Sequence, residues 1–368
     1  MKIDSVAIYT ITMNLKRPFR TSFGVQKTRE IVLIKLQYGE LCGWGESVTD
    51  TGPWYSPETN NSVVYIIKKF IGPWLKKEKE IKHPKDFTSI VSKIRGNPMA
   101  KACVEDALWD LYGKIKGKSL SQLLGGTKNK IPSGISLGIE NDFSVLLQKI
   151  EHAVEKKYKR VKIKIEPGWD VEIVKQIRDQ FPDLGLMVDA NAAYSLKDAE
   201  IFKKLDKYDL MMIEQPLHYK DIIEHSKLQK MISTPICLDE SIKSFDDAKH
   251  ALEMDATRII NVKPSRVGGI TETLEIHRLA EEFKVPLWVG GMLETGIGRA
   301  KNVAVASMKN FTLPNDISES ERYFIEYIID PIFKLDNNGE LGVPKENGIG
   351  VNVLQEKIEE LAISEEKI

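Results

Sequence analysis

The sequence has no excess of charge of either sign and no long apolar run. Its 368 residues include 53 Lys and Arg against 53 Asp and Glu, so the formal net charge is zero. A balanced charge gives no basic surface of the kind that binds nucleic acid. No apolar run approaches the roughly 18 residues that a membrane-spanning helix needs. We therefore expect a protein that has neither a nucleic-acid partner nor a membrane segment.

Cysteine is also scarce. Cys42, Cys103 and Cys237 are scattered and odd in number, which fits buried thiols in a reducing compartment better than disulfides or a zinc site. The N-terminal stretch alternates polar and apolar residues and contains Asp4, so it lacks the apolar core of a signal peptide. These features predict a cytoplasmic protein, and we further expect it to be a homo-oligomer.

What the sequence does contain is a regular spacing of charged residues. Each lies at or near the end of a short apolar run, and they recur about every 25 residues: Lys164, Asp189, Glu214, Asp239 and Lys263. The intervals contain stretches with helical periodicity, such as residues 171–181. Repeated β-α units of this kind build a parallel sheet. Charges at the C-terminal ends of such strands face the mouth of a barrel, where active sites lie.

The same spacing predicts the domain organisation of an α/β protein. Residues 126–319 are expected to form the barrel, with the first strand near residues 135–138 and a short eighth strand at 310–313. Residues 1–125 are expected to form an α+β capping domain, to which residues 320–368 return. Within the cap, residues 17–24 are too polar and too rich in Gly and Pro for a core, so we expect a functional loop there.

Three carboxylates, Asp189, Glu214 and Asp239, come from three neighbouring predicted strands. Their oxygens would converge and repel one another unless a cation lay between them. Ligation by oxygen alone, with open positions for water, suits Mg²⁺, with Mn²⁺ as the alternative. A single acid after a strand is more often a helix cap, but separate caps do not explain three on consecutive strands.

Two lysines, Lys162 and Lys164, lie two residues apart on one predicted strand, so both face the barrel interior. Like charge and a nearby dication are expected to lower a lysine pKa toward a value useful for a base. Lys164 lies nearer the end of the strand and is the predicted base, with Lys162 as its electrostatic neighbour. Strands two and six lie opposite each other in a ring of eight, so Lys263 should confront Lys164 across the metal. This geometry suits removal of a proton α to a carboxylate, with the metal stabilising the enediolate.

Other residues near the predicted mouth are candidates for contacts with the substrate or the metal ligands. Phe19, Phe23 and the stretch with Trp54 and Tyr55 would close over the substrate, or else pack in the core of the cap. Asn191 and Glu240 would support the metal ligands, although Glu240 could equally cap a helix. The remaining candidates are Ser136, Arg266, Gly291, Met292 and Glu294.

These motifs resemble the muconate-lactonizing-enzyme subgroup of the enolase superfamily over essentially the whole chain. The resemblance rests on Lys162-x-Lys164, Asp189-Ala190-Asn191, Glu214-Gln215-Pro216, Asp239-Glu240-Ser241 and Lys263. It implies a modified TIM barrel of the (β/α)7β type under the capping domain. The mandelate-racemase branch places a His-Asp pair on strands seven and six, and none of the six histidines lies there. Dipeptide epimerases usually carry Asp-x-Asp on strand eight, a pattern that Asn315-Asp316 does not match.

Within the subgroup, local strings at residues 18–24, 43–46, 261–269 and 291–298 are similar to o-succinylbenzoate synthases that also racemise N-acylamino acids. Arg266 is typical of that branch. The resemblance implies Mg²⁺-dependent dehydration of 2-succinyl-6-hydroxy-2,4-cyclohexadiene-1-carboxylate, a step toward menaquinone, together with racemisation of N-acylamino acids. The alternatives are a dedicated N-succinylamino acid racemase, another cycloisomerase or dipeptide epimerase of the subgroup, and a barrel that only binds a ligand.

Overall fold

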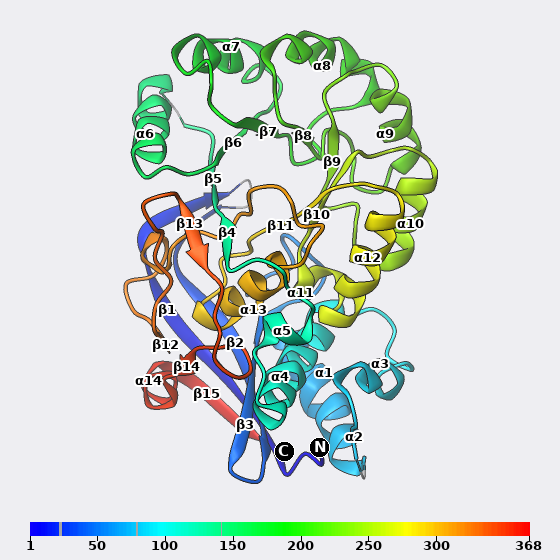
Figure 1. Ribbon diagram of the computed structural model, residues 1–368, viewed down its shortest axis with the longest axis vertical. Helices are drawn as coiled ribbons and strands as arrows, with labels where there is room; N and C mark the ends of the chain where they lie inside the picture. The colour runs from blue at the N-terminus through cyan, green and yellow to red at the C-terminus, as the bar shows by residue number, and fades with distance from the viewer. Residues whose placement is uncertain (22–23, 79, 141) are drawn as a thin grey trace.

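The computed structural model describes residues 1–21, 24–78, 80–140 and 142–368, without the side chains of residues 19–21 and 24. A barrel of β-α units fills the upper half of Figure 1, and a cap of antiparallel strands and helices lies below it. Both chain ends lie in the cap, where the amide of Val6 donates to the carbonyl of Ile368 at 3.2 Å. Among the described residues, no helix is long and apolar enough to cross a membrane.

The cap is built on a four-stranded antiparallel sheet in the order β15-β1-β2-β3. Its strands are β1 (Ser5–Thr21), β2 (Gly24–Tyr38), β3 (Leu41–Ser47) and the C-terminal β15 (Ala362–Lys367). The part of the expected loop at residues 17–24 that the structure describes is strand, because β1 continues to Thr21 and β2 begins at Gly24; residues 22–23 lie outside the described residues. The pairing of β1 with β2 shifts register between Asn14 and Phe19.

The helices of the cap pack on one side of this sheet. They are α1 (Asn60–Ile66), η1 (Ile67–Ile71), α2 (Gly72–Lys77), η2 (Pro84–Asp86), α3 (Phe87–Ile90), α4 (Pro98–Lys116) and α5 (Leu120–Leu123). The longest, α4, lies directly on β3 because two strand residues have no side chain. A Cβ on Gly43 would come within 2.0 Å of the Ala107 carbonyl oxygen, and one on Gly45 within 1.9 Å of the Cys103 carbonyl oxygen.

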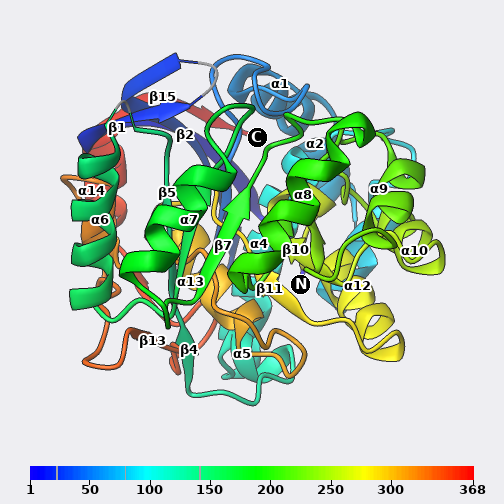
Figure 2. The ribbon, with the colours of Figure 1, turned by 90° about the horizontal axis from the view of Figure 1, so that it is seen from above.

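The barrel contains a seven-stranded parallel sheet in the order β11-β10-β9-β8-β7-β6-β5. Its strands are β5 (Gly134–Leu137), β6 (Arg160–Lys164), β7 (Leu186–Asp189), β8 (Ile213–Glu214), β9 (Ile236–Leu238), β10 (Ile259–Val262) and β11 (Leu287–Val289). Helices cover its outer face, as Figure 2 shows for α6 to α10: α6 (Phe143–Glu155), α7 (Val171–Gln180), α8 (Ala199–Leu205), α9 (Ile222–Gln229), α10 (Phe245–Glu253) and α12 (Ile270–Glu282). The predicted barrel and cap architecture is therefore confirmed.

The barrel closes differently from the expectation of a strand at residues 310–313. Residues 310–316 run beside β11 without forming a regular strand, and Pro314 has no N–H with which to continue a ladder. The amide of Asp316 donates to the carbonyl of Val289 at 2.9 Å, and β5 donates an amide to the carbonyl of Asn315 at 2.7 Å. The barrel is therefore joined through Asn315 and Asp316, a few residues later than expected.

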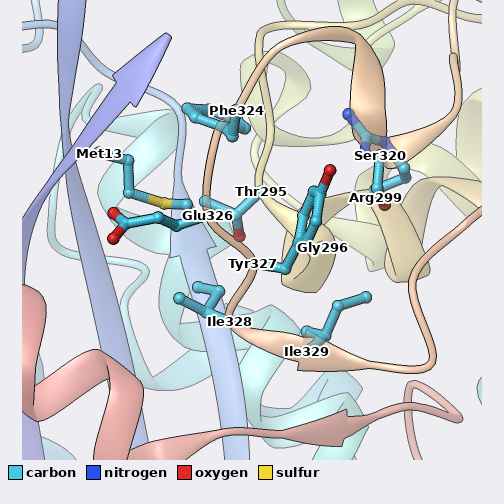
Figure 3. A pocket seen from close by; sticks show the side chains of 10 residues that line it. All are labelled: Met13, Thr295, Gly296, Arg299, Ser320, Phe324, Glu326, Tyr327, Ile328 and Ile329. Carbon is cyan, nitrogen blue, oxygen red and sulfur yellow. The ribbon is translucent and has the colours of Figure 1, made fainter. Parts of the chain in front are cut away.

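Helix α13 (Gly296–Ala306) lies between β11 and this seam, and beyond the seam the chain returns to the cap. The return contains η5 (Ser320–Arg322), β12 (Ile329–Asp330), β13 (Glu340–Gly342), β14 (Asn352–Val353) and α14 (Gln355–Leu361), and β13 pairs with β4 (Lys130–Pro132). A cavity of about 10 Å³ lies here, and Figure 3 shows Arg299 and Tyr327 on one side of it and Met13 and Glu326 on the other. It has room for about one water molecule, and the residues that line it are not those predicted to form the active site.

Candidate active site

The five regularly spaced residues meet at the C-terminal ends of the barrel strands. Lys164, Asp189 and Glu214 end β6, β7 and β8 and are register partners across these three strands. Asp239 and Lys263 directly follow β9 and β10. The spacing in the sequence thus reflects one β-α unit per charged residue, and the charges share one end of the sheet.

Lys164 lies on the more open side of this group. Its Nζ lies 3.2 Å from Asp189 Oδ2 and donates to Asn191 Oδ1. Asn191 has a φ of 42°, in the left-handed region that Asn tolerates better than most residues, and its Nδ2 donates to Glu240 Oε1 at 3.0 Å. The side chain of Lys164 is 34% exposed, so a substrate could reach its Nζ.

Lys263 lies on the enclosed side, with 11% of its side chain exposed. Its Nζ lies 2.8 Å from Asp239 Oδ2 and donates to the Tyr55 hydroxyl at 3.2 Å. Arg266 contacts the same two partners, through Asp239 Oδ1 and, at 3.2 Å, the Tyr55 hydroxyl. Because Tyr55 belongs to the cap, this lysine is held from both domains.

Lys162 lies deeper in the barrel and connects two carboxylates. Its Nζ lies 2.8 Å from both Glu214 Oε2 and Asp316 Oδ2. Asp316 also pairs with the buried Arg160 and accepts from Ser136 Oγ at 2.8 Å. This carboxylate is therefore fully engaged by protein donors.

Sequence reasoning missed two members of this inner group. Arg160 precedes Lys162 by two residues on the same strand, so the alternation that identified Lys162 and Lys164 could also have identified Arg160. Asp316 lies at the barrel seam and was compared only with the Asp-x-Asp pattern. The indole of Trp288 lies beneath the group, with its ring centroid 4.8 Å from the guanidinium of Arg160 and 5.1 Å from Lys162 Nζ.

The remaining candidates lie on the loop after β11 or outside the described residues. Glu294 is buried and accepts from the amide of Met292 at 2.8 Å and from Asn302 Nδ2 at 2.9 Å, so it organises its own loop. A Cβ on Gly291 would come within 2.4 Å of the Asp316 carbonyl oxygen, which explains the need for glycine there. Phe23 and the side chain of Phe19 lie outside the described part of the chain.

The buried carboxylates differ in their electrostatic environment. Burial raises the pKa of Glu214 to about 8; Lys162 opposes this shift, and the neighbouring charge of Asp189 adds to it. Burial also acts on Asp239, but Arg266 and Lys263 outweigh it and hold the pKa of that carboxyl well below its usual range.

The lowering of a lysine pKa predicted for the pair Lys162 and Lys164 beside a dication is not found at Lys162, and Lys263, for which none was predicted, also has a raised pKa. Burial does favour neutral Lys162, but Asp316 and Glu214 outweigh it and raise the pKa. Likewise, Asp239 outweighs burial at Lys263 and raises the pKa of that ammonium group. Reasoning from like charges omitted the carboxylates that each lysine contacts.

The three predicted metal ligands present a set of hard oxygen donors. Among the described residues, no three His, Cys, Asp or Glu side chains form a group that could hold a metal ion, and each of the three predicted ligands instead contacts a lysine. The repulsion that raises the pKa of Glu214 would be relieved by a divalent cation. The buried Glu240 Oε2 has no hydrogen-bond partner among the described residues. The chemistry of these donors therefore fits a hard divalent ion.

Comparison with known proteins places these residues in a family. The model of the mandelate racemase/muconate lactonizing enzyme N-terminal domain matches residues 4–125, and the enolase C-terminal domain-like model matches residues 146–357. The chain is 46% identical to an o-succinylbenzoate synthase of Bacillus subtilis, over 97% of this chain and 95% of that protein. It is 42% identical to an N-succinylamino acid racemase of Thermus thermophilus, over 96% and 95%. The crystal structure of an enolase superfamily member from Listeria innocua superimposes with a TM-score of 0.96 at 40% identity, covering 100% of this chain and 99% of that one.

Proposed function

Because the chain belongs to the enolase superfamily, with its mandelate racemase/muconate lactonizing enzyme domains, we propose that it removes the α-proton of a small carboxylate substrate. The proposed reactions are the dehydration catalysed by o-succinylbenzoate synthases and the racemisation of N-succinylamino acids. One relative of each name, at 46% and 42% identity over nearly the whole chain, supports this pair of activities.

The observation that carries the proposal is the placement of two lysines on either side of three carboxylates. Lys164 ends β6 and Lys263 follows β10, and each of the three strands between them ends in, or is directly followed by, one of the acids. Each lysine contacts a different carboxylate, Asp189 or Asp239. A substrate carbon between the lysines would have one proton-transfer group on each face.

Enzymes of the enolase superfamily bind a divalent metal ion. Here Asp189, Glu214 and Asp239 would hold it, as Mg²⁺ or Mn²⁺. When bound, the ion would neutralise the negative charge that develops on the substrate carboxylate as the proton leaves. Asn191 and Glu240, joined at 3.0 Å, would orient the ligands around it.

In dehydration, Lys164 would accept the α-proton and become an ammonium group. The same ammonium would then donate a proton to the departing hydroxyl group, which leaves as water and restores the neutral lysine. Lys263 would remain protonated and stabilise the anionic intermediate by its charge.

In racemisation both lysines would transfer protons. One lysine accepts the α-proton from one face, and the ammonium group of the other donates a proton to the opposite face. The reverse reaction exchanges their roles, so the two enantiomers use opposite lysines as the base.

The structure's charge pairs weigh against dipeptide epimerisation. An epimerase of the subgroup would use a strand-eight carboxylate to hold a free ammonium group. Asp316, which lies at this position, is already bound by Arg160, Lys162 and Ser136.

The test is to supply purified protein and Mg²⁺ with both substrate classes. Formation of o-succinylbenzoate reports dehydration, and loss of the α-proton signal of N-succinylamino acids in D₂O reports proton transfer. Turnover of the first substrate class without exchange of the second would remove racemisation from the proposal. The converse result would favour a dedicated racemase, and neither activity with metal present would contradict the proposal.

A further inference from the structure

The segment that follows Lys263 is too short to hold itself in place. Helix α11 (Pro264–Val267) begins directly after this lysine and carries Arg266. A helix of four residues has too few internal hydrogen bonds to be stable alone. Its position must therefore be fixed by tertiary contacts, which it makes with the cap helix α4 and with α12, while β10 directly precedes Lys263.

A buried ion pair between α4 and α13 is hydrogen-bonded to α11. Lys301, on α13, donates from Nζ to Asp106 Oδ2 on α4 at 2.8 Å and to Ser265 Oγ on α11 at 2.8 Å. The side chains of Lys301 and Asp106 are only 2% and 3% exposed. The network therefore connects the cap helix α4, the barrel helix α13 and the turn after Lys263, and no solvent competes for these bonds.

The preceding residue of α4 holds the far end of the same turn. Glu105 is buried and accepts from the amide of Thr271 at 3.1 Å, at the start of α12, and from its hydroxyl. A Cβ on Gly269 would come within 2.0 Å of Glu105 Oε2, so the acid lies directly against the backbone of the turn. Glu105 thus bonds residue 271 directly, and the adjacent Asp106 is linked to residue 265 through Lys301.

We propose that Asp106 and Lys301 are positioning residues that hold Lys263 in place for proton transfer. The inference rests on the proposed function, in which Lys263 transfers a proton in racemisation but contributes only charge in dehydration. Proton transfer requires hydrogen-bond distance, and a displacement of about 1 Å can cost on the order of 10²-fold in rate. Stabilisation by charge falls more gradually with distance. Loss of the pair should therefore impair the Lys263 face far more than the Lys164 face.

The test uses a variant that removes both charges. A single substitution would leave a buried charge unpaired and could prevent folding, whereas replacing both partners by apolar residues is often neutral. The double variant Asp106→Leu with Lys301→Met lacks the bond to Ser265 without leaving an unpaired charge. Asp110→Asn is the matched control, because this buried acid lies one turn along α4 and accepts from the amides of Trp44 and Ile349, and because its ion-pair partner Lys114 is 22% exposed, so that no fully buried charge is left unpaired.

The first measurement is deuterium incorporation into each enantiomer of N-succinylphenylalanine in D₂O with Mg²⁺. Lys263→Ala identifies the enantiomer that uses this lysine as the base. The double variant should exchange the α-proton of that enantiomer on the order of tenfold to a hundredfold more slowly than the wild type. Its exchange rate for the other enantiomer should change much less. In Asp110→Asn, the exchange rates of both enantiomers should change much less as well. Equal losses for the two enantiomers, or no loss for either, would overturn the inference.

The second measurement does not depend on activity. Backbone amide hydrogen exchange, followed by mass spectrometry, should be faster for residues 263–271 in the double variant than in the wild type. The same residues should exchange at the wild-type rate in Asp110→Asn. Residues 160–166 should exchange at the wild-type rate in both variants. Unchanged protection of residues 263–271 in the double variant would contradict the inference. Wild-type protein that exchanges neither enantiomer would refute racemisation in the proposed function, and amide exchange would still decide the positioning role.

Discussion

The two lysines of the site differ in what holds them. Within the described residues, the hydrogen-bond partners of Lys164 are Asp189 and Asn191, both on the barrel, and a third of its side chain is exposed. Lys263 is largely buried and contacts Asp239 from the barrel and Tyr55 from the cap. One lysine is therefore positioned by the barrel alone, and the other by the barrel and the cap together.

This difference separates two tasks that one site must perform. A base that acts in both reactions benefits from access to the substrate and from a rigid strand. A group that transfers a proton in one reaction and supplies only charge in the other can depend on the cap, because charge tolerates small displacements. Changes in the cap should then alter the balance of the two reactions more than the chemistry common to both.

The largest expected effect comes from loss of the metal site, which impairs proton transfer on both the Lys164 face and the Lys263 face. Asp239→Asn, or removal of metal by a chelator, should lower dehydration and racemisation together, on the order of 10³-fold, because the developing charge loses its stabilisation. Readdition of Mg²⁺ after chelation should restore the wild-type rates. Full turnover in chelator, after metal analysis has confirmed removal, would refute the metal assignment.

Next in size is the loss of one face. Lys164→Ala should lower α-proton exchange of one enantiomer and Lys263→Ala that of the other, each by about 10²- to 10³-fold. Either substitution should stop racemisation, because one face then lacks a proton donor or acceptor. The measurement is deuterium incorporation by NMR for each enantiomer, with metal binding checked in each variant. Loss of both enantiomers in both variants would contradict the assignment of one lysine to each face.

A conservative change at Lys263 should separate charge from proton transfer. Lys263→Arg keeps a positive charge, but a guanidinium group does not give up its proton in a protein. The factor by which the dehydration rate falls should therefore be at least ten times smaller than the factor by which the racemisation rate falls. The two rates, measured on one preparation, give the ratio. Equal losses would mean that Lys263 has the same role in both reactions.

Much of the fold and the meeting of the spaced charges at one end of the sheet could be predicted because they follow local rules. One charged residue for each β-α unit identified the parallel barrel and both lysines, and the two-residue period of a strand placed Lys162 inside it. The same rules were applied incompletely to Arg160. The assigned roles and the domain boundaries at residues 125 and 319 remain predictions.

The features that could not be predicted depend on contacts between distant parts of the chain. Pro314 moves the barrel closure to Asn315 and Asp316, which only the hydrogen bonds to both neighbouring strands reveal. The bond of Tyr55 to Lys263 joins residues more than 200 positions apart. No periodicity links such residues, so pattern reasoning assigned Tyr55 to the substrate and did not connect the cap with either lysine.

The smallest expected effect concerns that contact between the cap and the barrel. Tyr55→Phe keeps the ring, whose centroid lies 5.1 Å from Lys263 Nζ, and removes the hydroxyl group that accepts from Lys263 and Arg266 at 3.2 Å. A hydrogen bond is worth about 0.5–1.5 kcal/mol, so exchange on the Lys263 face should fall by about twofold to tenfold. Exchange on the Lys164 face should be nearly unchanged. The neighbouring Trp54 is 57% exposed, and Trp54→Phe is the matched control, which should leave the ratio of the two exchange rates as in the wild type. An equal fall on both faces in Tyr55→Phe would mean that the cap loop acts on the substrate rather than on Lys263.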